Sequence, residues 1–321
     1  MPLDPQAQQL LDTLHASGLP PIYTQPVAVA RQMVRASYAS DDPPEPIQQC
    51  DDLIIPGPAG DLKIRIYTPA ARGPLPILVY FHGGGWVVND LDTHDGICRT
   101  LANAASCLVT AVEMRRAPEA KFPEPLNDCF AATQWLAAHA PEINGDPERI
   151  AVGGDSAGGN LAAAVTLLAR DRGGPPLVFQ LLIYPVTDYY EPGTPSYHEN
   201  GTGYTLDRSF MVWAWENYLA NTADASHPLA APLKAPDLTN LPPAFIMTAE
   251  YDVLRDEGEM YAQRLSEAGV TVTCQRYAGM MHGFIIRPKV LDQGKQGLLD
   301  AAQALRTAFA PGFRSPLTKS K

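Results

Sequence analysis

A serine in a glycine-rich turn is the first residue of this sequence that could do covalent chemistry. Ser156 lies at the centre of residues 154–158, GDSAG, directly after the apolar run 150–153 and before a helical pattern. A tight turn from strand to helix tolerates little but glycine at its flanks, and it points the central hydroxyl into a cleft. The start of the helix adds a positive dipole end beneath a developing anion. This pattern predicts a nucleophilic serine; the alternative is an ordinary glycine-rich turn.

A second glycine-rich segment, HGGGW at residues 82–86, follows the apolar run 77–81. Three consecutive glycines expose backbone N–H groups that side chains would otherwise shield. Acyl transfer requires such donors at the oxyanion of its tetrahedral intermediate, where loss of one donor costs about 2.7–4 kcal/mol. A phosphate-binding loop is the alternative, but neither GK[ST] nor GxGxxG follows. His82 precedes the serine and is predicted to be a structural hydrogen-bonding residue rather than the base.

A serine hydroxyl is a poor nucleophile alone and requires a histidine base that a carboxylate orients. In enzymes with this type of serine turn, the acid and then the histidine follow the serine. Three histidines follow Ser156, namely His198, His227 and His282. His282 lies in a predicted loop between the last strand, 270–276, and the terminal helix, so it is the predicted base, with surface roles for the other two. Activity is expected to fall as pH drops, because a protonated imidazole cannot accept a proton.

The orienting carboxylate is sought between the serine and the histidine. Glu250 and Asp252 close the predicted strand 244–250, just before the predicted helix 257–268. Asp252 is the predicted acid because it lies on the loop past the strand end. Glu250 and Asp256 are the alternatives, and Asp252 could instead cap the helix that follows.

The rest of the sequence alternates between short apolar runs and longer helical patterns. The runs are rich in β-branched residues and mostly continuous, which is typical of strands buried on both faces. The alternation predicts an α/β fold, with helices on both sides of a mostly parallel sheet. An antiparallel hairpin turned at 57–60 is expected at its start. The predicted strands are 62–67, 77–81, 107–113, 150–153, 178–184, 244–250 and 270–276, and the predicted helices are 92–105, 126–139, 156–170, 257–268 and 291–308.

Two segments interrupt this alternation. Residues 1–46 contain two short helical patterns, and residues 185–240 contain an aromatic, turn-rich stretch with a helix over 207–219, for which Asp207 is the predicted N-cap. Because open α/β sheets place their sites at the carboxyl ends of the strands, we expect both segments to cap that edge. The predicted core is then formed by residues 47–184 and 241–321.

Composition excludes several classes of protein. The chain has 321 residues, of which 45% are hydrophobic and 18% charged, as in a globular protein with a large core. Its net charge of −11 argues against nucleic-acid binding, because counterion release requires a basic surface. Neither a signal peptide nor an apolar stretch of about 18 residues is recognisable, so no membrane association is expected. Five widely spaced cysteines without a CxxC pair predict free thiols in a reducing, cytoplasmic location.

In order and spacing, these motifs resemble those of the bacterial hormone-sensitive-lipase family of α/β-hydrolase esterases, in its GDSAG subgroup. The resemblance covers the whole chain and rests on HGGGW at 82–86, GDSAGG at 154–159, YDVLRDEG at 251–258 and HGF at 282–284. A further block, MRRAPE at 114–119, departs from the family's Tyr-Arg-Leu-Ala-Pro-Glu at its first and third positions.

The resemblance implies an α/β-hydrolase fold and a serine carboxylesterase that forms an acyl-enzyme and needs no metal or organic cofactor. It places the catalytic residues at Ser156, Asp252 and His282, and the oxyanion-hole amides at Gly84, Gly85 and Ala157. It further implies that Glu119 supports the oxyanion loop. Short- to medium-chain esters are the implied substrates, and a homodimer through the edge strand near 270–276 is the implied assembly.

Aromatic residues in the second capping segment favour an apolar acyl pocket over a charged one. The alternative, for those on the helix, is that they form its own buried face. Acyl chains longer than about ten carbons are expected to be poor substrates for a pocket of ordinary ligand size. The predicted substrate contacts are Trp86, Asp155, Tyr189, Tyr197, Phe210 and Trp213.

Three other functions remain open to different degrees. An amide or formamide hydrolase with the same triad is the main alternative, since the chemistry differs chiefly in protonation of the leaving group. A non-catalytic ligand-binding receptor on this fold is disfavoured because His282 is present. An interfacial lipase is disfavoured because the sequence lacks an amphipathic anchor.

Overall fold

The structure is a computed structural model that describes residues 2–38 and 43–310. Residues 1, 39–42 and 311–321, which include parts of the predicted first capping segment and of the predicted core, lie outside the described residues. The strands are β1 (Gln49–Gly57), β2 (Gly60–Thr68), β3 (Leu75–Phe81), β4 (Leu108–Val112), β5 (Gly145–Asp155), β6 (Phe179–Ile183), β7 (Ala244–Tyr251) and β8 (Val272–Met281). The α-helices are α1 (Pro5–Ala16), α2 (Val27–Tyr38), α3 (Asp95–Ala105), α4 (Glu124–His139), α5 (Ala157–Arg172), α6 (Pro195–Glu199), α7 (Arg208–Tyr218), α8 (Arg255–Glu267) and α9 (Asp292–Ala308).

The eight strands form one sheet in the order β1-β2-β4-β3-β5-β6-β7-β8. β2 pairs antiparallel with β1 and with β4, and all pairs from β4 to β8 are parallel. The predicted α/β fold with a mostly parallel sheet is therefore confirmed. The predicted hairpin is confirmed as well, because Gly57 and Gly60 face each other at the turn between β1 and β2.

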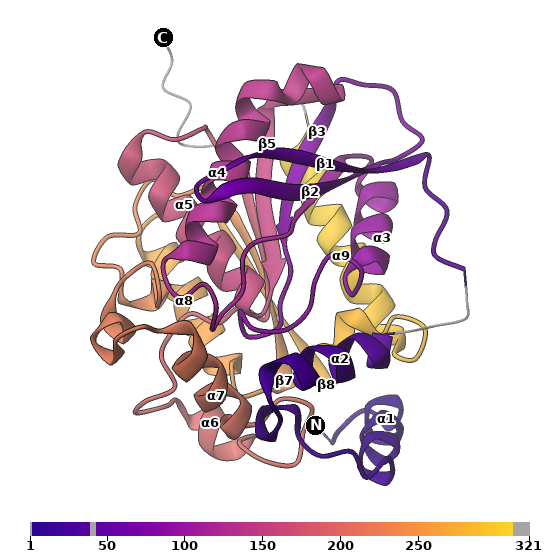
Figure 1. Cartoon of the computed structure of the whole chain (residues 1–321), viewed down its shortest axis with the longest axis vertical. Coiled ribbons are helices and arrows are strands. Elements are labelled where there is room, and N and C mark those ends of the chain that lie inside the picture. The colour runs from indigo at the N-terminus through magenta and orange to yellow at the C-terminus, as the bar shows by residue number, and fades with distance from the viewer. Residues whose placement is uncertain (1, 39–42, 311–321) are drawn as a thin grey trace.

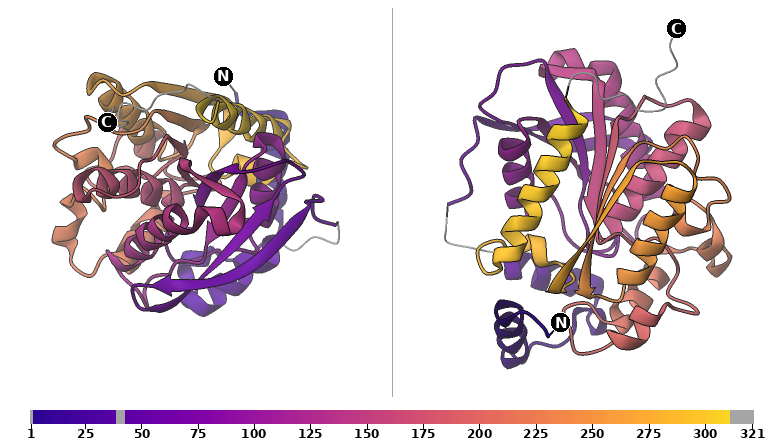
Figure 2. Two further views of the ribbon diagram at one scale, coloured as in Figure 1. Left: turned by 90° about the horizontal axis from the view of Figure 1, so that it is seen from above. Right: turned by 180° about the vertical axis from the view of Figure 1, so that it is seen from behind.

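Each central strand supplies side chains to two separate cores. In β3, Ile77, Val79 and Phe81 join one buried cluster, whereas Leu78 and Tyr80 join the other. This alternation follows from the two-residue period of a strand, and it explains why the run reads as continuously apolar. Helices α4, α5 and α8 cover the first face of the sheet, and α3 and α9 cover the second (Figures 1 and 2).

Strand β8 is longer than its sequence predicted. It pairs with β7 as far as Tyr251 opposite Met281, beyond the predicted end at residue 276. As an edge strand it needs no second partner, so exposed polar side chains are tolerated along it and obscure the apolar pattern. The homodimer through this edge stays a prediction.

Helices from both interrupting segments gather at one end of the sheet. In Figure 1, α1, α2, α6 and α7 lie at the lower end, where β7 and β8 finish. The helix predicted over 207–219 is α7, and the predicted N-cap is present because the Asp207 carboxylate accepts a hydrogen bond from the Phe210 amide at 2.7 Å. Helix α6 was not predicted, since its five residues are too few to show a helical period.

The cysteines are free thiols, and their surroundings differ. Cys98, Cys107 and Cys129 are buried in the core, whereas Cys50 is half-buried and Cys274 is exposed on β8.

Candidate active site

Ser156 occupies a strained turn between β5 and α5. Its φ of 56° and ψ of −120° lie outside the regions that non-glycine residues normally adopt. The chain can pass this point because glycines stand two residues before and two residues after Ser156. A Cβ atom on Gly154 or Gly158 would lie 2.4 or 1.9 Å from the carbonyl oxygen of Phe81. The sequence GDSAG is therefore required by the close approach of β3, as well as by the turn itself.

The ends of β7 and β8 bring Asp252 and His282 together. Tyr251 pairs with Met281 as the last residues of these strands, so the next residue of each leaves the sheet at the same point. His282 Nδ1 lies 2.6 Å from Asp252 Oδ2, and His282 Nε2 lies 3.0 Å from Ser156 Oγ. Because a carboxylate only accepts, Nδ1 carries the proton and Nε2 is free to accept from the serine hydroxyl.

The Asp252 carboxylate is fully buried and held in place by the backbone. Its Oδ1 accepts a hydrogen bond from the Leu254 amide at 2.9 Å, while Oδ2 faces the histidine. The competing carboxylates lie elsewhere. Glu250 accepts from the Gly279 amide, and Asp256 accepts from the Ser196 amide at 2.7 Å and from Arg255 at 2.8 Å.

Two glycines after β3 present amide groups to the same space. Gly84 and Gly85 have φ values of 112° and 59°, and both line the cavity at Ser156. In the described part of the chain, no group accepts a hydrogen bond from either amide. Ala157 is the first residue of α5, where an amide has no acceptor within the helix. Gly84 and Gly85 thus lie in the same cavity as Ser156, while the assignment of these three amides to an oxyanion hole stays a prediction.

Asp155 supports this glycine loop from behind. Its buried carboxylate accepts hydrogen bonds from the Tyr80 hydroxyl at 2.8 Å and the Gly83 amide at 3.0 Å, and His94 lies 3.2 Å away. Burial alone would raise the pKa of Asp155, but His94 and these hydrogen bonds lower it below its usual value. Asp155 also lines the cavity at Ser156, so its predicted contact with substrate stays a prediction, although its carboxylate already accepts hydrogen bonds from protein groups.

His82 is also structural, as predicted. Its ring is buried, and Nδ1 lies 2.8 Å from the carbonyl oxygen of Gly83, to which it donates. Burial and the nearby His94 lower the pKa of His82 to about 4. In the unfolded chain the same group has a pKa of about 6.5.

This difference predicts acid sensitivity of the fold. Between pH 6.5 and 4 the unfolded chain binds a proton that folded His82 does not, so stability falls as pH drops through this window. At pH 4.5 the loss from this group is about 2–3 kcal/mol. His82→Asn is expected to lose that much less stability than the wild type between pH 7 and pH 4.5, measured by urea unfolding. The exposed His198→Asn is the matched control, and equal acid sensitivity of His82→Asn and wild type would contradict the assignment.

An arginine from the N-terminal segment fixes the loop after the glycines. Arg31 on α2 donates to the carbonyl oxygens of Val87 at 2.8 Å and Ala117 at 2.9 Å. Glu119 pairs with Arg31 at 2.7 Å, so its expected support of the oxyanion loop is indirect. The sequence did not identify Arg31, because nothing local marks a side chain whose partners are 56 or more residues away.

A cavity of about 450 Å³ opens at Ser156. Its walls come from α1 and α2, the glycine loop, the start of α7 and the segment after His282. Of the predicted aromatic contacts, Phe210 lines it. Residues not predicted also line it, among them Tyr38, Asn89, Tyr184 and Arg287. Tyr184 follows the carboxyl end of β6, and that position was a usable signal for a site residue.

The other predicted aromatic contacts are corrected by the structure. Trp86 is buried and stacks on Tyr218, with 4.2 Å between ring centroids, so it joins α7 to the core rather than walling the cavity. Tyr197 is buried away from the cavity, while Tyr189 packs against Trp215 and Trp213 packs against Phe210. The alternative interpretation, that helical aromatics form the helix's own packing face, therefore holds for Trp213.

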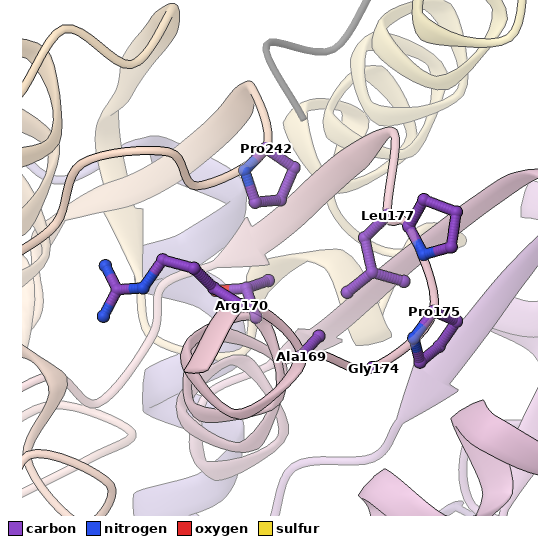
Figure 3. A pocket seen from close by; sticks show the side chains of 8 residues that line it. Ala169, Arg170, Gly174, Pro175, Leu177 and Pro242 are labelled. Carbon is purple, nitrogen blue, oxygen red and sulfur yellow. The ribbon is translucent and has the colours of Figure 1, made fainter. Parts of the chain in front are cut away.

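A second, smaller cavity of about 180 Å³ lies near the opposite ends of the strands, by the end of α5 (Figure 3). Its one charged lining residue, Arg170, already donates to the carbonyl oxygens of Asp237 and Thr239. Within residues 2–38 and 43–310, no cluster of His, Cys, Asp and Glu could hold a metal ion. No helix in those ranges is both long enough and apolar enough to cross a membrane.

Comparisons with known proteins agree on one family. Residues 78–286 match the sequence family described as having the alpha/beta hydrolase fold. The chain is 40% identical to carboxylesterase NlhH of Mycobacterium tuberculosis over 94% of its own length and 96% of that protein's. It is 37% identical to an ethyl acetate hydrolase of Pseudomonas putida, with coverage of 76% and 78%. The solved structure of a hyperthermophilic esterase from Pyrobaculum calidifontis superposes with a TM-score of 0.92 at 39% identity, covering 97% of this chain and 100% of that one.

Proposed function

The chain belongs to the α/β-hydrolase-fold family, as a bacterial hormone-sensitive-lipase-type esterase, and from this premise we propose that it is a serine carboxylesterase of short- to medium-chain esters. One observation carries the proposal, the hydrogen-bonded series Ser156–His282–Asp252 at 3.0 and 2.6 Å. Relatives named carboxylesterase and ethyl acetate hydrolase support it.

In the proposed reaction, Ser156 attacks the ester carbonyl while His282 Nε2 takes the hydroxyl proton. Asp252 keeps the proton on Nδ1 and stabilises the imidazolium that forms. The amides of Gly84, Gly85 and Ala157 hold the oxyanion of the tetrahedral intermediate. His282 then protonates the leaving alcohol, and a water molecule repeats the cycle on the acyl-enzyme to release the acid.

In the proposed domain organisation, residues 47–184 and 241–321 form the catalytic core. Segments 1–46 and 185–240 act as the cap. The lining of the cavity supports this, because α1, α2 and the start of α7 form much of its wall above Ser156. Closure over the serine excludes water from the developing charge, which strengthens its stabilisation by the amides.

Chain-length dependence on 4-nitrophenyl esters tests the proposal. Rates are expected to peak between acetate and octanoate and to fall beyond about ten acyl carbons, because a cavity of about 450 Å³ lies in the lower half of the range of ligand sites. Initial rates from acetate to palmitate, with 4-nitroacetanilide as the amide counterpart of the acetate, measure this. A rise toward palmitate would contradict the chain-length proposal, and faster turnover of the anilide would favour an amide hydrolase.

A further inference from the structure

One cation on the cavity wall has no partner of opposite charge. Of the described residues that line the cavity, Arg287 is the one arginine or lysine, and its side chain is half-buried. Within residues 2–38 and 43–310, no carboxylate forms an ion pair with it. The side chain is held instead over the ring of Tyr38, with the guanidinium carbon 5.8 Å from the ring centroid. Such a contact orients the guanidinium without using up its hydrogen bonds.

The carboxylates that line the same cavity, in contrast, are satisfied by other groups. Asp155 is bound by Tyr80, Gly83 and His94. Asp207 accepts from the Phe210 amide at 2.7 Å and from the Tyr23 hydroxyl at 2.9 Å. Arg287 therefore neutralises neither carboxylate by direct contact. The N–H donors of its guanidinium group stay available to a ligand.

Further unpaired polar atoms belong to residues that line the same cavity. The buried Asn89 Oδ1 and the buried Tyr184 hydroxyl have no hydrogen-bond partner within the described ranges, and both residues line the cavity. Burial and the Asp155 carboxylate raise the pKa of Tyr38 above its ordinary value, and Arg287 and Asn89 oppose that rise. Four segments far apart in the sequence thus bring Tyr38, Asn89, Tyr184 and Arg287 to the wall of one cavity.

This wall is next to the reacting atoms. The Tyr184 ring centroid lies 4.4 Å from that of His282, which is itself 3.0 Å from Ser156 Oγ. Burial beside Asp155 and Tyr38 raises the pKa of Tyr184, so its hydroxyl keeps its proton and can donate it in a hydrogen bond. A ligand group bound to this wall would be a short distance from the ester bond being cleaved.

We propose that Arg287, with Tyr38 and Tyr184, forms an anion subsite that selects esters carrying a carboxylate group. The inference rests on the proposed function, since the same substrate must reach Ser156. A guanidinium recognises a carboxylate through two parallel hydrogen bonds, and the Tyr184 hydroxyl can add a third donor. The net charge of −11 repels anions at long range, so selection depends on this short-range contact.

Paired charged and neutral esters test the subsite. On the acyl side the pair is mono-4-nitrophenyl adipate and its methyl ester; on the alcohol side it is 4-acetoxybenzoate and its methyl ester. In at least one pair, wild-type kcat/KM is expected to favour the charged ester by about tenfold or more, mostly through KM. Adding 0.5 M NaCl is expected to reduce this preference, because salt screens a partly exposed ion pair.

Variants of Arg287 test whether this residue causes the preference for charged esters. Arg287→Met is expected to lower the charged-to-neutral ratio of kcat/KM by about 10- to 100-fold, and Arg287→Lys to retain much of it. Arg208→Met is the matched control, because Arg208 also lies over a tyrosine ring, that of Tyr190 at 5.7 Å, but does not line the cavity. It is expected to keep the wild-type ratio.

The outcomes separate the inference from the proposed function. Hydrolysis of neutral esters without preference for the charged member of either pair overturns the subsite alone. An unchanged ratio in Arg287→Met also overturns it, and so does an equal loss on charged and neutral esters. No turnover of any of the four esters removes the proposed function and the subsite with it. If Arg287→Met does not fold, three other results still test the subsite. These are the preference of the wild type for the charged esters, the salt dependence of that preference, and the ratio in Arg287→Lys.

Discussion

Replacing Ser156 with alanine is expected to lower kcat on 4-nitrophenyl butyrate by about 10⁴- to 10⁶-fold. The variant retains the amides of Gly84, Gly85 and Ala157 but has no atom that can form the acyl-enzyme. The small rate that remains would come from water attacking a substrate held against those amides. Steady-state rates measure the effect, and they are divided by a protein concentration that is determined without titration of the active site.

Two controls accompany this variant. The fold is expected to be preserved, because the substitution removes only one hydroxyl group. The strained backbone at residue 156 is held by the hydrogen bond that its amide donates to the carbonyl oxygen of Ile183 at 2.8 Å, and this bond remains. Matched far-ultraviolet circular dichroism and melting curves check this. Ser209→Ala removes an exposed hydroxyl at the start of α7 and is expected to leave kcat unchanged. Turnover in folded Ser156→Ala within tenfold of wild type would exclude Ser156 as the nucleophile.

The segments that bring Ser156, Asp252 and His282 together were predictable because their sequence requirements are local. A glycine is needed at 154 and 158 since β3 leaves no room for a side chain, and that requirement is visible as GDSAG. The carboxyl ends of parallel strands lie at one edge, so Asp252 and His282 could be placed at that edge without knowing the register. The structure adds the register itself, with Tyr251 opposite Met281.

The cavity wall could not be predicted in the same way, because it is assembled by packing between distant segments. Trp86 follows the glycines in sequence, yet its ring turns away from the cavity and stacks on Tyr218 of α7. Tyr38 and Arg287 are 249 positions apart and meet only because α2 and the segment after His282 both reach the same end of the sheet. Aromatic residues in a capping segment therefore indicate a packed helix as readily as a pocket.

The second large effect is expected for Asp252→Asn, which should lower kcat by about 10³- to 10⁴-fold with little change in the fold. The asparagine oxygen can still accept from the Leu254 amide, so its NH₂ group then faces His282 Nδ1. Nδ1 must become an acceptor, and the proton moves to Nε2. In that tautomer the histidine cannot take the proton of Ser156. Rates and melting curves of the variant, compared with wild type at pH 8, measure both parts of this prediction.

Asp256→Asn is the matched control, since it makes the same chemical change four residues away. Asp256 accepts from the Ser196 amide and from Arg255, and it does not contact His282. A loss below tenfold is expected, because only the attachment of α6 to α8 is weakened. Comparable losses in both variants would mean that the acid acts through the α8 region as a whole rather than through one carboxylate. A large loss confined to Asp252→Asn would instead show that catalysis depends on which nitrogen of His282 carries the proton.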